Sequence, residues 1–213
     1  MSVHLRPEEI EAESFRMIDE EAGPHHWSPA EWPVVRRVIH TSADFEYTRS
    51  LVFSHSAIAE GIAALRKGRG IVTDTTMALA GIGKPRLARF GISGSCHIAD
   101  PEVARDAKEQ QVTRSLLAMR KAAAIATNGI FVIGNAPTAL FELVRLVRED
   151  GVRPDLIVGL PVGFVGAAES KAALLELEQE YPSIPFITNR GRKGGSNVAA
   201  AVINALLIMA TGE

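Results

Sequence analysis

The sequence predicts an α/β protein in which a parallel sheet is covered by helices on both faces. Three short apolar runs, residues 129–133, 155–158 and 184–187, are each followed by a turn and then by a helical pattern. None of these runs alternates apolar with polar residues, as expected for strands that are buried on both faces. Strands that alternate with helices in this way are typical of a parallel sheet joined by crossover helices.

Composition narrows the class of protein. With 213 residues, 46% of them apolar and 23% charged, the chain is expected to form a single domain over residues 1–213. The net charge of −2 argues against nucleic acid as a partner, because phosphate backbones are bound by broad basic faces. One cysteine, Cys96, excludes an intrachain disulfide and a cysteine-rich metal site. With neither a secretion signal nor a membrane span in the sequence, we expect a cytoplasmic protein.

The N-terminal half contains more mixed patterns. A helix is expected from Pro7 to about Glu21, because proline suits a first helical turn. Its inward-facing residues would be Ile10, Phe15 and Ile18. The β-branched run at residues 34–39 predicts a strand that ends at His40. Farther along, the patterns predict a helix at residues 56–66, short strands at 71–73 and 90–93, and a mostly helical stretch at 101–126.

The C-terminal half contains three successive strand–turn–helix units. Their helices are expected at residues 137–148, 167–180 and 197–209. Parallel sheets bind ligands beyond the carboxyl ends of their strands, so residues near those ends can line one crevice. The residues at or just after predicted strand ends are His40, Thr76, Asn135, Gly163 and Arg190.

The loop at residues 190–196 indicates an anion-binding site. It holds Arg190, Arg192 and Lys193 among three glycines and leads into the last predicted helix. A helix N-terminus exposes unpaired N–H groups and the positive end of the helix dipole, which suits an anion. The loop differs from the phosphate loop of nucleotide hydrolases, since its lysine precedes the glycine pair. A solvated basic turn is the other interpretation.

His40 is the candidate proton donor. It is followed by Thr41, Ser42 and Asp44, and an imidazole near a carboxylate can transfer a proton near neutral pH. A histidine at a strand end can equally be structural. We therefore keep both interpretations at this point.

Two arginines and two turns complete the candidate ligand contacts. Arg114, which follows Thr113 at a helix start, and Arg16 are candidate clamps for carboxylates, although single arginines are usually surface residues. The turn at residues 134–138 lacks the glycine fingerprint of a dinucleotide site and is better placed to offer backbone N–H groups. The turn at 160–165 suggests a fixed backbone against a large, flat ligand. The sequence also lacks a glycine-rich fingerprint for S-adenosylmethionine.

Five motifs together carry a resemblance to a known family. They are His-Thr-Ser-Ala-Asp at 40–44, Thr-Asp-Thr-Thr-Met at 73–77, Gly-Asn-Ala-Pro-Thr at 134–138, Pro-Val-Gly-Phe-Val at 161–165 with Glu-Ser-Lys at 169–171, and Gly-Arg-Lys-Gly-Gly-Ser at 191–196. In this order they resemble the precorrin-8X methylmutase family of cobalamin biosynthesis. The resemblance runs from about Pro7 to Leu207, nearly the whole chain.

The resemblance implies a three-layer flavodoxin-like fold, a homodimer and an isomerase. The family moves a methyl group from C-11 to C-12 of the corrin ring in a formal 1,5-sigmatropic shift. The product would be hydrogenobyrinate, or cobyrinate when the ring carries cobalt, with no cofactor and no external methyl donor. The family's active-site histidine falls on His40, which would protonate or hydrogen-bond the ring at the pyrroline that bears the migrating methyl.

The predicted site therefore combines one catalytic residue, His40, with groups that hold the carboxylate arms of a tetrapyrrole. The predicted substrate-binding residues are Ser14, Arg16, Thr41, Ser42, Thr76, Arg114, Asn135, Ala136, Thr138, Arg190, Arg192, Lys193, Gly194, Gly195 and Ser196. Two rival functions remain. A tetrapyrrole carrier would use the same pocket without a proton donor, and a nucleotide-binding or phosphate-binding α/β enzyme would use the basic loop for phosphates.

Overall fold

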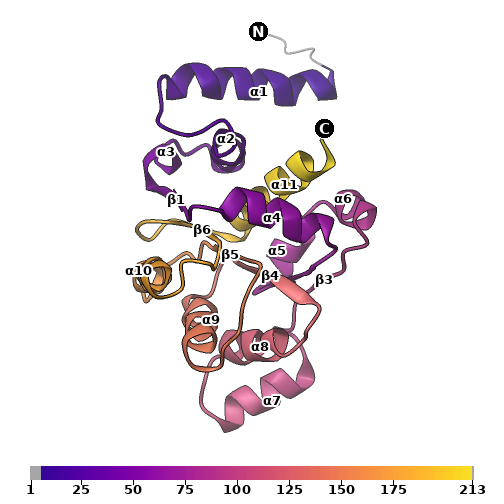
Figure 1. The fold of residues 1–213 in the computed structure, drawn as a ribbon, viewed down its shortest axis with the longest axis vertical. Coiled ribbons are helices and arrows are strands. Elements are labelled where there is room, and N and C mark those ends of the chain that lie inside the picture. Colours follow the sequence, from indigo (N-terminus) through magenta and orange to yellow (C-terminus); the bar gives the residue numbers. More distant parts are fainter. Residues whose placement is uncertain (1–5, 213) are drawn as a thin grey trace.

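Six strands form one sheet at the centre of the molecule (Figure 1). The structure, a computed structural model, describes residues 6–212. The strands are β1 (Leu51–Phe53), β2 (Gly70–Thr73), β3 (Gly94–Ser95), β4 (Asn128–Ile133), β5 (Leu156–Gly159) and β6 (Phe186–Asn189). Their order across the sheet is β1-β6-β5-β4-β2-β3.

The sheet is mixed rather than fully parallel. Strands β2 to β6 pair in parallel, as the sequence predicts. The edge strand β1 runs antiparallel to β6, with Leu51 opposite Asn189 and Phe53 opposite Ile187. The sequence analysis missed β1, because three residues are too few to show a pattern. The expectation of an all-parallel sheet is therefore wrong at this edge.

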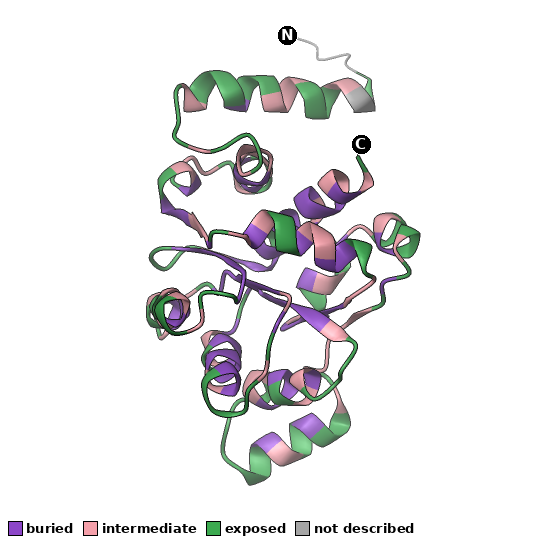
Figure 2. Ribbon diagram, in the orientation of Figure 1, coloured by how far each residue is buried: buried purple, intermediate pink, exposed green. Residues whose placement is uncertain are grey.

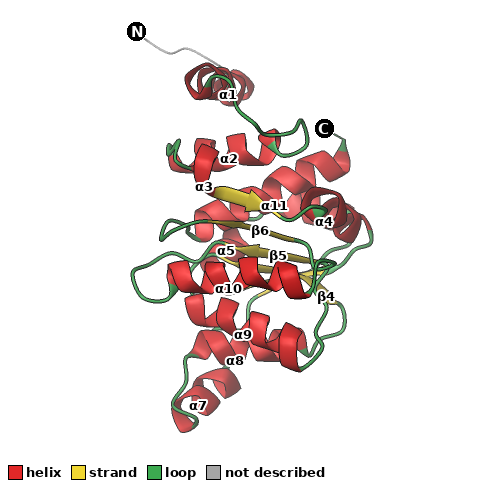
Figure 3. Cartoon of the chain, turned by 60° about the vertical axis from the view of Figure 1, so that its left-hand side comes forward, coloured by secondary structure: helices red, strands yellow, loops and turns green. Residues whose placement is uncertain are grey.

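Helices cover both faces of the sheet, which gives the three-layer α/β architecture that the sequence predicts (Figure 3). They are α1 (Pro7–Ala22), α2 (Trp32–Ser42), α3 (Tyr47–Ser50), α4 (Ala57–Arg66), α5 (Thr76–Gly81), α6 (Lys84–Arg89), α7 (Pro101–Glu109), α8 (Arg114–Ala123), α9 (Pro137–Glu149), α10 (Ala167–Glu180) and α11 (Ser196–Thr211). One face packs against α2, α4 and α11, and the other against α8, α9 and α10.

Successive residues of β4 point alternately into the two apolar cores, one on each face of the sheet. Ile130 and Val132 belong to the core with α11, whereas Phe131 and Ile133 belong to the core with α9. Side chains of a strand point to opposite faces in turn, so a strand covered on both sides must be apolar throughout. Buried residues are accordingly concentrated in the sheet and in the inner helices, especially α11 (Figure 2).

The run at residues 34–39 is a helix, not the strand that the sequence analysis predicts. Its apolar residues Val34, Val35, Val38 and Ile39 are buried and fall on one face of α2, with the period of a helix. A short continuous apolar run fits a strand or a buried helix equally well, and periodicity alone cannot separate them. As a result His40 lies in the last turn of a helix.

Helix α1 packs on the outside of α2, and ion pairs join the two helices (Figures 1 and 3). Arg36 pairs with Asp19 at 2.8 Å, and Arg37 pairs with Glu11 at 2.7 Å. The helix spans the predicted residues, and Ile18 is buried as expected. Ile10, however, is 50% exposed, so the prediction that it faces inward is wrong.

Two further expectations need correction. No strand forms at residues 90–93, and β3 begins one residue later, at Gly94. The helical stretch expected at 101–126 is divided into α7 and α8, and Thr113 caps the start of α8 by accepting a hydrogen bond from the Leu116 N–H. The helix α10 has the predicted bounds, and the other C-terminal helices differ from them by no more than a few residues.

The loops after β5 and β6 approach so closely that only glycine fits at Gly194. A Cβ atom there would lie 2.2 Å from the carbonyl oxygen of Leu160 and 2.6 Å from that of Pro161. Both obstacles are backbone atoms, which cannot rotate away. The crossing of these two loops therefore depends on the missing side chain.

We expect Gly194→Ala to lower the free energy of unfolding by about 1–3 kcal/mol, the usual cost of overpacking. The matched control is Gly83→Ala, whose new methyl would meet its nearest neighbour at an ordinary 3.4 Å. Urea denaturation of both variants measures the difference. Equal stabilities for Gly194→Ala and Gly83→Ala would contradict the proposed crossing.

Candidate functional site

The predicted site residues that neighbour strand ends lie at one edge of the sheet, the edge formed by the carboxyl ends of its parallel strands, whereas Ser14 and Arg16 lie on α1. The carboxyl ends of β2, β4, β5 and β6 lie at this edge because these strands are parallel. The antiparallel direction of β1 brings the segment that precedes it, residues 40–50, to the same edge. The chain leaves β2 for β3 on one side and returns to β4 on the other, which creates a switch point between β2 and β4, where α/β proteins bind ligands.

A buried carboxylate holds the two sides of the switch point together. Asp74, just after β2, accepts hydrogen bonds from the backbone N–H groups of Gly134, Asn135 and Ala136 at 2.9, 2.8 and 2.7 Å. Burial raises the pKa of Asp74, and the three hydrogen bonds oppose that rise. The three bonds fix the turn after β4 that carries the predicted residues Asn135 and Ala136. The sequence analysis did not assign Asp74, although it lies inside one of the five motifs.

Hydroxyl groups connect this turn with the neighbouring segments. The Oγ1 atom of Thr75 lies 2.8 Å from the Oγ atom of Ser196, the first residue of α11. Thr113 donates to Thr138 at 2.8 Å, which places the start of α8 beside the turn. Arg114 follows Thr113 and is exposed. Thr76, exposed at the start of α5, completes this part of the edge.

The basic loop lies across the ends of β5 and β6. The Gly195 N–H donates to the Leu160 carbonyl at 3.0 Å, and the Gly163 N–H donates to the Arg192 carbonyl at 3.2 Å. Gly195 is the cap of α11, so the predicted glycine loop does lead into a helix N-terminus. The guanidinium of Arg192 lies 5.7 Å above the ring of Phe164, which is 85% exposed.

Of the three cations in this loop, Lys193 is already paired. Its ammonium contacts Asp44 at 2.5 Å and Glu46 at 2.9 Å, and these hydrogen bonds raise the pKa of Lys193. Arg190 and Arg192 are exposed and form no ion pair with any residue in the described range 6–212. The two arginines are therefore the cations that the loop offers to a ligand, and Lys193 instead ties the loop to the His40 motif.

His40 lies in the last turn of α2 and is exposed. Its ring meets the ring of Phe15 edge to face at a centroid distance of 5.2 Å. A cavity of about 480 Å³ opens beside it between α1 and α2, and its lining includes the predicted residue Ser14. Of the predicted neighbours, Thr41 is exposed, and Ser42 donates its hydroxyl to the Val38 carbonyl at 2.7 Å.

The guanidinium of Arg16 is already paired with acidic side chains, so Arg16 is not the free clamp for a carboxylate that the sequence predicts. On the exposed side of α1, its guanidinium binds Glu13 and Glu20 of the same helix, each at 2.6 Å. Arg16 also does not line the cavity beside His40. A carboxylate arm would have to compete with both glutamates for this side chain.

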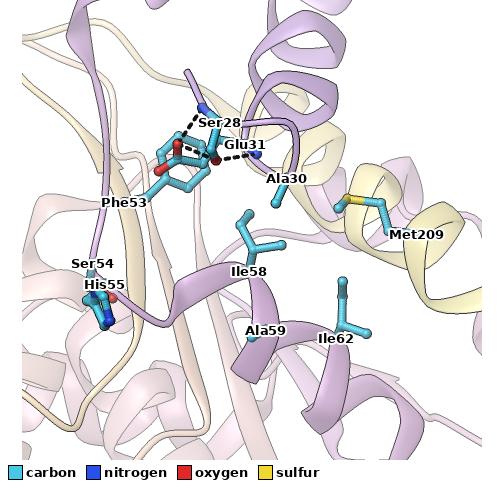
Figure 4. Close-up of a pocket in the computed structure, with 10 residues that line it drawn as sticks. All are labelled: Ser28, Ala30, Glu31, Phe53, Ser54, His55, Ile58, Ala59, Ile62 and Met209. Atoms are coloured by element: carbon cyan, nitrogen blue, oxygen red, sulfur yellow. Dashed lines mark hydrogen bonds between the residues drawn. The ribbon is translucent and has the colours of Figure 1, made fainter. Parts of the chain in front are cut away.

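A second hollow, of about 380 Å³, lies away from this edge (Figure 4). Ile58, Ala59 and Ile62 of α4 line it opposite Met209 of α11, and Glu31 is hydrogen-bonded to Ser28 at its rim. It begins near His55, at the opposite end of β1 from the His40 segment. None of the predicted site residues lines this hollow.

Lys171, like Asp74, is a buried charged residue that was not among the predicted site residues. Its side chain is 1% exposed, and its ammonium donates to the Asn189 side-chain oxygen at 3.0 Å and to the Lys193 carbonyl at 2.6 Å. The sequence feature that could have revealed its burial is its position on the apolar stripe of α10, where Ala167, Leu174 and Leu177 are also buried.

Within residues 6–212, no group of three or more histidine, cysteine, aspartate and glutamate side chains is arranged to hold a metal ion. In the same range, no helix is both long enough and apolar enough to cross a membrane.

Fold and edge together define an α/β protein with exposed arginines just after the carboxyl end of β6 and an exposed histidine in the segment that leads to the same edge. A sequence model of the precorrin-8X methylmutase family matches residues 9–209, nearly the whole chain. The chain belongs to the precorrin-8X methylmutase family.

Relatives of known name and structure agree with this assignment. The chain is 49% identical to the cobalt-precorrin-8 methylmutase of Priestia megaterium, over 97% of this chain and 89% of that protein. It is 39% identical to the precorrin-8X methylmutase of a Sinorhizobium species, over 91% of this chain and 90% of that protein. The crystal structure of precorrin-8X methylmutase from Thermus thermophilus superposes with a TM-score of 0.86 at 43% identity, covering 96% of this chain and 97% of that one.

The buried ammonium of Lys171 is expected to make the free energy of unfolding depend on pH. Burial lowers the pKa of Lys171 from 10.5 to about 8. Below about pH 8 both the folded and the unfolded chain carry this proton, and the folded state bears the cost of burying the charge. Between about pH 8 and 10.5 the unfolded chain binds more protons, so the contribution of Lys171 to the free energy of unfolding rises with pH.

We therefore expect wild type to gain stability relative to Lys171→Met as the pH rises from about 8 to about 10. Below about pH 7 the difference between the two proteins is expected to be constant. Urea denaturation of both proteins at a series of pH values measures this difference, in which the other titrating groups cancel. A difference that stays constant up to pH 10 would show that the ammonium is not destabilised by burial.

Proposed function

We propose that the chain catalyses the methyl shift from C-11 to C-12 of precorrin-8X or its cobalt form, with His40 as the proton donor. The observation that carries the proposal is the connection between His40 and the basic loop. Asp44, in the same motif as His40, pairs with Lys193 of the loop across 149 residues of sequence. A proton donor and a cationic binding loop thus belong to one edge of the sheet.

His40 is suited to the chemical step. Protonation of the conjugated ring, or a hydrogen bond to it, makes the ring more electrophilic and lowers the barrier to migration of the methyl group. A single general acid typically contributes about 10²–10⁴-fold to a rate. Orientation of the ring and exclusion of water supply the remainder. No external methyl donor enters this reaction, because the methyl group moves within one molecule.

The rest of the edge is suited to a flat macrocycle with carboxylate arms. Arg190, Arg192 and the N-terminus of α11 offer positive charge and N–H groups to such arms. Arg114, Thr76 and Asn135 are exposed at the switch point and are candidates for other arms. The apolar side chains Met77, Phe164 and Val165 are 70%, 85% and 90% exposed near the same strand ends, where they can cover a ring face.

We also propose that the enzyme is a cytoplasmic homodimer. The apolar residues just named, together with Ile10 and Met17 of α1, are exposed beyond what a lone chain requires. A second copy that covers them would also exclude water from a ring bound at the edge. Light scattering of the purified protein tests the dimer.

A direct assay tests the proposed activity. The purified protein is mixed with cobalt-precorrin-8 and, separately, with precorrin-8X, and formation of cobyrinate or hydrogenobyrinate is followed. Conversion of either compound supports the proposal, and the preferred compound identifies the natural form. A thermal-shift comparison with nucleotides is the counter-test, because stabilisation by nucleotides alone would favour the phosphate-binding alternative.

We expect His40→Asn to lower kcat by about 10²–10⁴-fold while the dissociation constant of the product stays within about threefold of wild type. Asparagine keeps a polar side chain but cannot transfer a proton near neutral pH. The matched control is His55→Asn, at an exposed histidine near the second hollow, which is expected to keep wild-type kcat. A His40→Asn protein with unchanged conversion would remove His40 from the mechanism, and a wild type that binds but never converts would indicate a carrier.

A further inference from the structure

Lys171 is the one lysine whose side chain is buried among the six in the chain, all of which lie within the described residues. It lies in the second turn of α10, directly beneath the basic loop, and is 1% exposed. A lysine can usually extend its ammonium to water. Lys171 instead keeps its charge inside the protein.

The ammonium of Lys171 and the amide of Asn189 form one buried cluster that holds the basic loop at residues 190 and 193. Lys171 donates to Asn189 Oδ1 at 3.0 Å and to the Lys193 carbonyl at 2.6 Å. The Asn189 Nδ2 atom donates to the Lys193 carbonyl at 2.9 Å and to the Arg190 carbonyl at 3.2 Å. The backbone of residues 190–193 is therefore fixed at its first and last carbonyl groups.

No carboxylate balances the charge of Lys171 within residues 6–212. Both of its acceptors are neutral oxygen atoms. The two acidic side chains that reach the loop, Asp44 and Glu46, bind the ammonium of Lys193 instead. Burying an unpaired charge is costly, and a fold that needed only to pin its loop could do so with a neutral donor.

We propose that Lys171 is a positioning residue that sets the basic loop to hold a carboxylate arm of the substrate, whose negative charge balances its ammonium. Lys171 does not touch the arm in this arrangement. Arg190, Arg192 and the start of α11 make the contacts, and Lys171 fixes their backbone from below. The ligand class is thus a carboxylate on a larger molecule, and this inference rests on the proposed methylmutase function.

A purely structural role of Lys171 would lead to a different experimental result. If Lys171 only connects α10 to the loop, its removal changes stability but leaves the affinity for anionic ligands unchanged. If it positions the loop for an anion, its removal raises KM and the dissociation constant of the product while kcat at saturation is preserved. The split between KM and kcat therefore separates the two roles.

The test compares wild type with Lys171→Met, whose unbranched side chain is one atom shorter and carries no charge. We expect KM and the dissociation constant of the product to rise by about tenfold, with kcat within about threefold, because roughly one charge-assisted interaction is lost. The matched control is Lys67→Met, at an exposed lysine just before β2 and therefore at the opposite edge of the sheet. The control is expected to match wild type in all three quantities.

A double variant shows whether Lys171 acts through the loop. In Lys171→Met/Arg192→Gln, the dissociation constant of the reaction product is expected to rise by less than the two single-variant fold-changes multiplied together. The reason is that both changes disable one arm-binding site. Independent, fully multiplicative losses would overturn the proposal. So would a Lys171→Met protein with wild-type KM and product affinity.

A measurement on wild type decides the matter if Lys171→Met does not fold. The lysine ammonium groups are observed by proton–nitrogen NMR with and without product. The Lys171 signal is expected to shift on saturation while that of Lys67 stays in place, and an unmoved Lys171 signal would overturn the proposal. Product binding is read independently of turnover, so a wild type that binds product but fails the conversion assay rejects the proposed activity alone, and the shift of the Lys171 signal still decides the role of Lys171.

Discussion

The edge of the sheet depends on close backbone contact among the loops that follow β2, β4, β5 and β6. Gly194 and Gly134 lack side chains because a Cβ at either position would lie 2.6 Å or less from the backbone of a neighbouring loop or helix start. Asp74 then adds three hydrogen bonds to the turn after β4. Four segments far apart in sequence thereby become one rigid surface, which is what a catalyst needs to hold a large ligand in one orientation.

This rigid edge carries two buried charges, Asp74 and Lys171. Asp74 receives three N–H groups, whereas Lys171 has only neutral acceptors and no carboxylate. Charges of this kind cost free energy of folding and are commonly retained where a site needs them. The exposed apolar residues Phe164 and Val165 at the same edge are a second feature that folding alone does not explain. The proposed anionic, flat ligand at this edge would account for both the uncompensated ammonium of Lys171 and these exposed apolar side chains.

Much of the fold could be predicted from sequence, because the strand–turn–helix units of the C-terminal half are local patterns. The region around His40 could not, since the run Val34–Ile39 suits a strand as well as a helix and β1 has only three residues. His40 nevertheless lies at the predicted edge. Because β1 is antiparallel to β6, the segment that precedes β1 lies at the carboxyl ends of the other strands. The pairing of Lys193 with Asp44 joins residues 149 positions apart, and no local pattern reveals such a contact.

The most direct test of this account is hydrogen–deuterium exchange with and without cobyrinate or hydrogenobyrinate. Slower exchange on binding is expected at the segments that meet at the edge, residues 40–46, 74–77, 134–138 and 190–196. Exchange at residues 55–62, which border the second hollow, is predicted to stay unchanged. Protection confined to residues 55–62, with the edge unaffected, would contradict the central claim that the macrocycle binds at the carboxyl ends of the strands.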